Sequence, residues 1–554
     1  MKYSRSRFSL LSRAWVALGL VSFGFLAGCG SGSSNPPPVT TYTIGGTAIN
    51  LVGMGGGLQL QLNGGDSLLV NENGAFTFSA PLAAGTEYTV TVSAQPSAPA
   101  QLCEVTHGTG TATADVTTVA VDCGHNEWMW ASGSNTASQV ATYGTEGTAA
   151  PENVPGARGG SITWVDAAGN LWLFGGSGAV PQNAPFSQYG YYFNDLWKYS
   201  GGEWAWMSGS STPNQTGTYG TQVTPAPGNV PGARQGSVSW TDSSGSFWLF
   251  GGVGYDSTGS FFPNFSYLND LWKYSAGQWT WMGGSSVSSP PGYGSVATYG
   301  AQGVAAPGNV PGGRVGAASW TDKSGNFWLF GGLGYATNTW SAGFLNDLWK
   351  YSGGQWIWMS GSNTTGHSAT YGTQGVAAPG NTPGAESDVA TWTDTSGNLW
   401  LFDGALWKFS AGEWTWMGGT PTNSKGVYGT VGTPAADNMP GPRSGSTSWT
   451  DPSGNFWLFG GYGIDSTGAL GDLNDLWKYS AGKWTWMGGS NIVGAAGIYG
   501  TQGVAAPGNV PGARVVGGAT WSDASGNLWL FGAGPLTGFG PPSPQLNDLW
   551  KYEP

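Results

Sequence analysis

The chain has 554 residues, of which 98 are glycine and only 9% are charged, and its formal net charge at pH 7 is −12. This turn-dense composition favours an all-β exported protein with room for more than one domain. An acidic chain without a basic stripe argues against binding to nucleic acid and against electrostatic binding to anionic lipid.

The start of the chain has the pattern of an export signal. Basic residues precede an apolar run over 14–27, and residues 26–29 read Leu-Ala-Gly-Cys. This pattern predicts a secretory signal peptide over 1–28 and a flexible linker over 29–40. The end of the run resembles the lipobox of bacterial lipoproteins, and the resemblance implies a lipid anchor on Cys29. Gly30 in place of Asp favours the outer membrane, facing the periplasm or the cell surface.

Residues 41–123 predict a small β-sandwich domain. Runs such as LQLQL and EYTVTVS alternate apolar and polar residues and are separated by Gly-Gly or Asn-Gly, as is typical of strands and turns. Cys103 and Cys123 are the only cysteines after Cys29. Because an exported chain meets oxidising conditions, we expect these two cysteines to form a disulfide.

The rest of the chain is a repeat. Five tryptophan positions occur in six copies, so thirty of the 32 tryptophans belong to one pattern. Each copy reads as four strands: a strand that ends in Trp, a turn with Asp, the run WLFGG, a variable loop, the run NDLWKY and a Trp-x-Trp pair. These residues resemble the Kelch repeat. The resemblance implies a six-bladed Kelch-type β-propeller over 124–554, with one blade for each repeat.

The last copy ends after NDLWKY and lacks the Trp-x-Trp strand. A Trp-x-Trp segment at 126–131 precedes the first complete copy. We therefore expect the N-terminal strand 126–131 to complete the last blade, which closes the ring and leaves no unpaired sheet edge between its ends.

The regular spacing of the tryptophans predicts that they form the core between blades, because residues i and i+2 of a strand share one face. Trp340 is the only irregular tryptophan after the signal, and it lies in the variable loop of the third copy. An exposed Trp340 would be a contact residue.

Antiparallel alternation places the long variable loops at one end of every blade, and long loops are where binding concentrates. We call this end the loop face. Among its aromatics, Trp340, Tyr191, Phe262 and Tyr267 are candidate binding residues for a protein or carbohydrate partner. The alternative is that they pack on one another and order the loops. The full set of loop aromatics is Phe186, Tyr189, Tyr191, Tyr192, Phe261, Phe262, Phe265, Tyr267 and Trp340.

Five copies carry an arginine at the start of the first strand and an aspartate in NDLW, and the fourth copy lacks both. This joint loss predicts an Arg–Asp ion pair within each of the other five blades. The fourth copy instead has Glu386, Asp388 and Asp403, which predict an acidic notch suited to a cation or a polar ligand. Loss of the consensus by drift is the alternative.

Copper radical oxidases similar to galactose oxidase are also Kelch propellers. They need a cysteine crosslinked to tyrosine and two histidine ligands, whereas this repeat region has no cysteine and only His367, with His125 at its edge. Sialate mutarotases are another Kelch family, which uses a carboxylate and an arginine. We expect a monomeric binding module without metal, cofactor or catalytic residues. The alternative is a sugar-acting enzyme, such as a sialate mutarotase-like isomerase, that uses the fourth-blade carboxylates.

Overall fold

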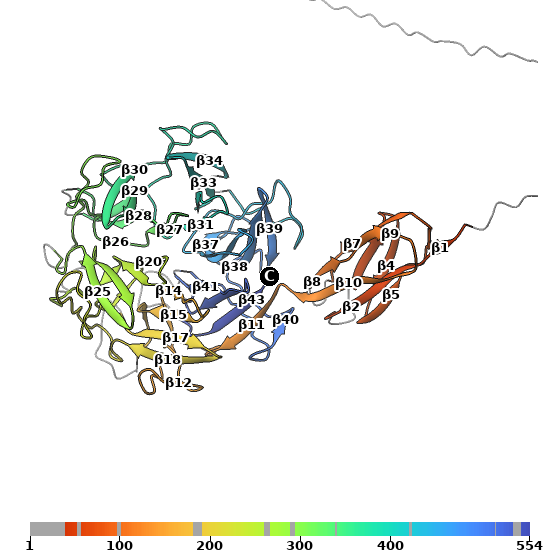
Figure 1. Ribbon diagram of the computed structural model, residues 1–554, viewed down its shortest axis with the longest axis horizontal. Coiled ribbons are helices and arrows are strands. Elements are labelled where there is room, and N and C mark those ends of the chain that lie inside the picture. Colours follow the sequence, from red (N-terminus) through yellow and green to blue (C-terminus); the bar gives the residue numbers. More distant parts are fainter. Residues whose placement is uncertain are drawn as a thin grey trace, which may run out of the picture.

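The computed structural model describes residues 39–51, 57–96, 101–180, 191–259, 266–288, 294–337, 341–419, 424–515, 517–535 and 544–554. Over these residues the chain is all-β and has no helix (Figure 1). None of the described segments is therefore a helix that could cross a membrane. The candidate residues Cys29, Phe262 and Trp340 lie outside the described residues, as do Phe186, Tyr189, Phe261 and Phe265.

Two four-stranded sheets make up the part of the chain before the repeat. The first has the order β5 (Gly74–Thr77), β2 (Ile44–Ile49), β10 (Val116–His125), β8 (Leu102–Thr106). The second has the order β4 (Asp66–Val70), β3 (Leu58–Leu62), β7 (Glu87–Ala94), β9 (Thr109–Thr111). A short pair is formed by β1 (Thr41–Tyr42) and β6 (Leu82–Ala83).

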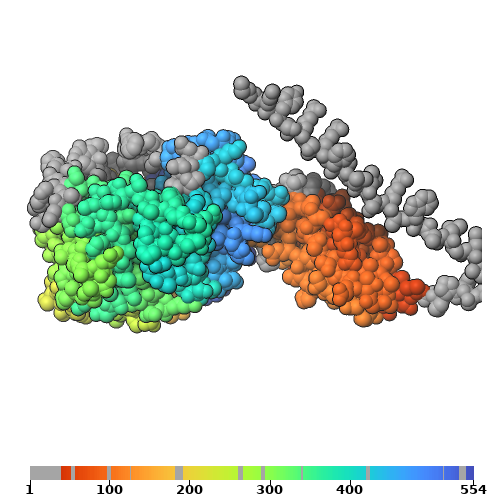
Figure 2. Space-filling model, turned by 90° about the horizontal axis from the view of Figure 1, so that it is seen from above, coloured from red at the N-terminus to blue at the C-terminus, as the bar shows by residue number. Residues whose placement is uncertain are grey.

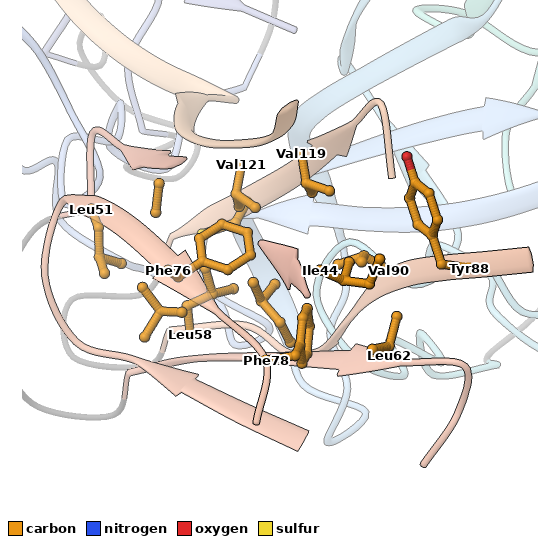
Figure 3. Packing of buried hydrophobic residues seen from close by; sticks show 14 of the residues in the cluster. Ile44, Leu51, Leu58, Leu62, Phe76, Phe78, Tyr88, Val90, Val119 and Val121 are labelled. Carbon is orange, nitrogen blue, oxygen red and sulfur yellow. The ribbon is translucent and has the colours of Figure 1, made fainter. Parts of the chain in front are cut away.

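The two sheets share one apolar core. In β3 the leucines are buried and the intervening glutamines are not, as the alternation of the sequence predicts. Ile44 and Val121 of the first sheet pack in the same cluster as Leu58 and Val90 of the second (Figure 3). A disulfide between Cys103 and Cys123 joins β8 to β10, which confirms that prediction.

The described residues from Glu127 to Glu553 form six main sheets, each with four strands of the repeat, and two small sheets of two and three strands. In the first sheet these are β14 (Ile162–Val165), β15 (Leu171–Phe174), β17 (Leu196–Ser200) and β18 (Glu203–Ser208). In the second they are β20 (Val238–Thr241), β21 (Phe247–Phe250), β24 (Leu271–Ser275) and β25 (Gln278–Gly283). In the third they are β27 (Ala318–Thr321), β28 (Phe327–Gly334), β29 (Gly343–Ser352) and β30 (Gln355–Ser360).

The remaining three sheets have the same order of strands. In the fourth these are β31 (Ala390–Thr393), β32 (Leu399–Phe402), β33 (Ala405–Ser410) and β34 (Glu413–Gly419). In the fifth they are β36 (Thr447–Thr450), β37 (Phe456–Ile464), β38 (Leu470–Ser480) and β39 (Lys483–Gly488). In the sixth they are β41 (Ala519–Ser522), β42 (Leu528–Phe531), β43 (Leu549–Glu553) and β11 (Glu127–Ser132).

The first strands of the six sheets stand around a common centre (Figure 1). Each of β14, β20, β27, β31, β36 and β41 contacts the next, and β41 contacts β14, so the ring is closed. Side chains bond across these contacts, as where the hydroxyl of Thr163 donates to the carbonyl of Thr520 at 2.8 Å. Figure 2 shows the ring edge-on, with the two sheets that precede the repeat beside it.

The sixth sheet combines two distant segments of the chain. Strand β11 pairs antiparallel with β43, with Trp128 opposite Tyr552. The ring of Trp128 also lies 5.4 Å from that of Phe459 in the fifth sheet. The first strand of the repeat region therefore holds the last sheet to its neighbour.

Short two-residue strands flank the sheets. The outer edges of two sheets are paired by β12 (Ala149–Ala150) with β18 and by β40 (Ala505–Ala506) with β11. On the other side of the sheets lie β13 (Arg158–Gly159), β16 (Ser177–Gly178), β19 (Arg234–Gln235), β22 (Val253–Gly254), β23 (Ser266–Tyr267), β26 (Arg314–Val315) and β35 (Arg443–Ser444).

Most of the repeated tryptophans are buried between neighbouring sheets, which confirms their assignment to the core. Trp164 of the first sheet stacks on Phe247 of the second at 5.2 Å, and Trp240 of the second stacks on Phe327 of the third at 5.1 Å. The second tryptophan of each Trp-x-Trp pair is only half-buried. Its indole donates to a backbone carbonyl two residues later, as Trp206 does to Ser208 at 2.8 Å.

Candidate functional site

Five of the six sheets contain a buried Arg–Asp pair, as the joint loss of both residues from the fourth copy predicted. In the first sheet Arg158 donates two hydrogen bonds to Asp195, at 2.6 and 2.9 Å, and a third to the carbonyl of Gly175 at 3.0 Å. Burial acts to lower the pKa of Arg158, but the charge and hydrogen bonds of Asp195 raise it. The other pairs are Arg234–Asp270, Arg314–Asp347, Arg443–Asp475 and Arg514–Asp548.

The aspartate of each pair accepts two further hydrogen bonds. In the first sheet the hydroxyl of Tyr143 and the indole N–H of Trp197 both donate to Asp195 at 2.8 Å. Burial and the charge of Asp195 raise the pKa of Tyr143 well above its ordinary range. In the four other sheets the same role is filled by four tyrosines and four tryptophans: Tyr219, Tyr299, Tyr428, Tyr499, Trp272, Trp349, Trp477 and Trp550.

The fourth sheet keeps the aromatic residues and lacks the Arg–Asp pair. The rings of Tyr371 and Trp407 lie 5.1 Å apart at 30°, close to the 5.0 Å and 36° between Tyr143 and Trp197. Ala405, two residues before Trp407, stands where the other sheets have Asp. The aromatic packing is therefore preserved, but the aspartate that accepts hydrogen bonds from the tyrosine and the tryptophan in the other sheets is absent.

Glu386 and Asp403 form a pair of carboxyl groups in this position. Burial and the charge of Asp403 raise the pKa of Glu386 to about 9, and burial also raises the pKa of Asp403. Burial, with the charges of Asp403 and Glu386, raises the pKa of Tyr371 to about 12. Asp403 accepts a hydrogen bond from the backbone N–H of Ala405 at 2.6 Å. At neutral pH this carboxyl pair shares one proton, because two adjacent buried carboxylates repel one another.

The indole N–H of Trp407 is buried and has no hydrogen-bond partner among the described residues. The five equivalent tryptophans all donate to the aspartate of an Arg–Asp pair. Unpartnered indoles also occur at Trp240 of the second sheet and at the first tryptophans of four Trp-x-Trp pairs, namely Trp204, Trp279, Trp414 and Trp484. Within its own class, Trp407 alone lacks a partner in the part of the chain described.

Asp388 lies apart from the carboxyl pair, on an inner ring of backbone bonds that runs from sheet to sheet. Its N–H donates to the carbonyl of Gly316 at 2.7 Å, and the N–H of Gly445 donates to its own carbonyl at 2.8 Å. The other sheets have glycine here, and Asp388 has a φ of 57°, which is costly for a residue with a side chain. Its exposed side chain adds a carboxylate to this ring, with a hydrogen bond from the Ser387 hydroxyl at 2.9 Å.

The loop aromatics that the structure describes pack against other aromatics. Tyr267 meets Tyr335 edge-on at 5.6 Å, and Tyr192 meets Tyr255 at 6.4 Å. Tyr192 is buried, and Tyr267 and Tyr191 are half-buried. These contacts agree with the alternative interpretation, in which the described aromatics order the loops.

His367 is an exposed residue whose ring nitrogen bonds the hydroxyls of Ser362 at 2.8 Å and Thr364 at 2.7 Å. In the described ranges no three His, Cys, Asp or Glu side chains come together as a metal site. Tyr371 and Trp407 also belong to the fourth-sheet site, and neither was among the residues predicted for it. The recurring Tyr-Gly of the interblade segments, at Tyr143, Tyr219, Tyr299, Tyr371, Tyr428 and Tyr499, was the available signal for the tyrosine.

Comparison with protein-family models gives no match, and none of the curated proteins matches the sequence. Among solved structures, the protein YjhT is 12% identical and has a TM-score of 0.40, covering 72% of this chain and 95% of its own. A fungal alcohol oxidase of the AA5 family, solved in complex with copper, is 12% identical with a TM-score of 0.38, covering 74% of this chain and 77% of its own.

Proposed function

We propose that the chain is a lipid-anchored, exported binding module. In this proposal a signal peptide over 1–28 and a linker over 29–40 lead to a β-sandwich over 41–123, and a six-bladed Kelch-type propeller spans 124–554. The anchor is the lipidated Cys29, and the location is the outer membrane. The partner is a protein or a carbohydrate.

The departure of the fourth sheet from its five counterparts supports this proposal. Most of the repeated tryptophans are buried in the core. The residues that could recognise a partner are therefore those that depart from the repeat consensus. Glu386, Asp403 and the unpartnered indole of Trp407 lie at the position where each of the five other sheets has an Arg–Asp pair whose aspartate accepts the equivalent indole N–H. Buried polar groups without partners are costly, which favours their use by a ligand.

The binding surface in this proposal comprises the fourth-sheet carboxyl groups and the loop aromatics. Its residues are Glu386, Asp388, Asp403, Tyr191, Phe262, Tyr267 and Trp340. Screening the full chain against arrays of glycans and of envelope proteins tests the proposal. We expect saturable binding that is weakened at least tenfold by Trp340→Ala or by Glu386→Gln with Asp403→Asn. Absence of any saturable partner would contradict a binding role.

A second candidate function rests on the carboxyl pair. A glutamate whose pKa is raised to about 9 holds a proton at neutral pH, as a general acid requires. With Asp403 beside it, Glu386 could exchange protons with a sugar hydroxyl, as in a sialate mutarotase-like isomerase. NMR of the anomeric equilibration of N-acetylneuraminate tests this activity. An enzyme would accelerate the exchange and lose that acceleration in Glu386→Gln.

A further inference from the structure

The five complete Arg–Asp pairs show what a guanidinium group meets at this position of the repeat. In the third sheet Arg314 donates to the carbonyl of Gly312 at 3.0 Å and to that of Gly331 at 2.9 Å. Its two terminal nitrogens donate to the carboxylate of Asp347 at 2.7 and 2.8 Å. Two backbone carbonyls and one carboxylate therefore surround each guanidinium.

The fourth sheet keeps the backbone positions of the two carbonyl acceptors, but it has no arginine, and Ala405 replaces the aspartate. Gly384 precedes Glu386 by two residues, as Gly312 precedes Arg314, and Asp403 stands where Gly331 stands. The side chain of Glu386 folds back over Gly384, since a Cβ added at Gly384 would lie 3.2 Å from a Glu386 carboxyl oxygen. In the described structure no lysine or arginine forms a salt bridge with Glu386 or Asp403.

The donors of the missing aspartate are also retained. The buried indole N–H of Trp407 has no acceptor in the described structure, although its ring packs against Tyr371 as in the other sheets. In those sheets the equivalent tyrosine and tryptophan both donate to the carboxylate that the arginine neutralises. The fourth sheet thus keeps the donors for such a carboxylate and has two carboxyl groups of its own, Glu386 and Asp403, but it has neither the arginine nor the aspartate of the pair.

We propose that the carboxyl groups of Glu386 and Asp403 bind an external guanidinium group, the arginine side chain of a partner protein. This inference rests on the proposed binding function and names the chemistry of its partner. A planar guanidinium matches two carboxyl groups better than an ammonium does, because its N–H groups form a rigid fork. The indole N–H of Trp407 and the hydroxyl of Tyr371 would hydrogen-bond the carboxylate that binding creates.

The fourth sheet is also more open than its counterparts. Glu386 is half-buried, whereas the arginine at the same position of each other sheet is at most 5% exposed. The chain passes from Phe402 to Ala405 without the variable loop that follows this strand in the other copies. A side chain from outside can therefore approach a position that the chain itself fills elsewhere.

Binding of a guanidinium releases a proton. The cation enters charged, the proton held by Glu386 leaves to solvent, and no covalent bond between heavy atoms changes. The groups that face Glu386 are Asp403 and Tyr371, with Asp388 two residues further along. The neighbouring Arg443 is held by Asp475, and the His367 ring is held by hydroxyl groups. Affinity for the cation should therefore rise with pH up to about 9.

Titration calorimetry of the full chain with N-acetyl-arginine methylamide tests this inference. The lysine and citrulline analogues of the probe provide the comparison, because citrulline has nearly the shape of arginine without its charge. We expect saturable binding of the arginine probe, at least tenfold weaker binding of the lysine probe and no binding of the citrulline probe. Two buffers of different ionisation enthalpy should show proton release, and affinity should increase from pH 6 to pH 8.

Two variants and one control locate the site. Glu386→Arg with Ala405→Asp rebuilds the Arg–Asp pair of the other sheets, so it should fold, melt at a higher temperature and lose the arginine probe. Glu386→Gln with Asp403→Asn should also lose the probe. Asp437→Asn removes one exposed acid of the same region and should leave affinity within twofold.

Absence of saturable binding to the wild type would overturn the inference, and so would undiminished binding to the rebuilt variant. Equal affinity for the arginine and citrulline probes would overturn it too, because the ligand would then be a neutral polar group. If the arginine probe fails while partners from the arrays still bind, only this inference falls. If no array partner binds, the proposed function itself falls, whatever the probe does.

Discussion

The third and fourth sheets share the same four strands and the same tilted Tyr–Trp contact, but they differ in the charged groups beside it. Arg314 and Asp347 neutralise one another in the third sheet, whereas Glu386 and Asp403 share a proton in the fourth. The backbone and the aromatic packing are nevertheless alike. The aromatic contacts are therefore sufficient to form a sheet of this ring, and the buried ion pair is an addition to them. A sheet without the pair can use its polar groups for a ligand.

The comparison between the two sheets assumes that all six sheets belong to one closed ring. Deletion of residues 124–131 opens that ring and should therefore lower its stability more than any other change. The deletion removes β11, which pairs with β43 and packs on the fifth sheet. We expect loss of the cooperative thermal transition of the whole ring. A melting curve equal to that of the wild type would show that the sheets are stable without closure.

Breaking a complete Arg–Asp pair should lower the stability of the fold less than the deletion does. It should lower it far more than the equivalent substitution in the fourth sheet does. Arg314→Met leaves the buried charge of Asp347 without its partner, which should lower the free energy of unfolding by about 3–5 kcal/mol. Glu386→Met leaves Asp403 buried, but burial raises the pKa of Asp403, so that carboxyl can take up a proton and the free energy of unfolding should fall by less than about 1 kcal/mol. Urea denaturation measures both variants. Equal losses would contradict the distinction between the two sheets.

The carboxyl pair should give the fourth sheet its own pH dependence. The pKa of Glu386 is about 9 in the folded chain, against an ordinary value of 4.5. Between these values the folded chain binds more protons than the unfolded chain, so this group makes stability fall as pH rises. Glu386→Gln removes the effect, and its melting temperature should exceed that of the wild type by a margin that grows from pH 5 to pH 9. Parallel curves would contradict the raised pKa.

The smallest expected effect concerns a feature that both sheets keep. Lys350 lies 5.4 Å from the ring centre of Trp328, and Lys408 lies 5.5 Å from that of Trp400. Lys350→Ala and Lys408→Ala should each lower the free energy of unfolding by about 0.5–1 kcal/mol. The exposed Lys425 lies over none of the described rings, and Lys425→Ala is the control. Unequal losses would extend the difference between the sheets beyond the Arg–Asp position.

The spacing of tryptophans was sufficient to predict an all-β repeat with an aromatic core, because each indole recurs at the same place in a strand. The joint absence of Arg and Asp from the fourth copy was sufficient to predict the ion pairs. The part played by Tyr371 was not predictable from spacing, since it lies in an interblade segment 36 residues before Trp407 and meets it only in the folded chain. The sequence also does not show that the indole N–H of Trp407 lacks an acceptor, because the acceptor is set by which side chains lie next to the indole in the folded chain.

The pairing of β11 with β43 also has a consequence for the order of folding. Asn126 and Tyr552, which are hydrogen-bonded at 3.1 Å, are separated by 426 positions along the chain. Because a chain is synthesised from its N-terminus, β11 is made first of the repeat strands and must wait for the last one. Bringing such distant segments together is slow in comparison with forming local hairpins. The newly made chain therefore carries an open ring with two unpaired edges until its final residues emerge, and this is the stage at which a chaperone would have most to protect.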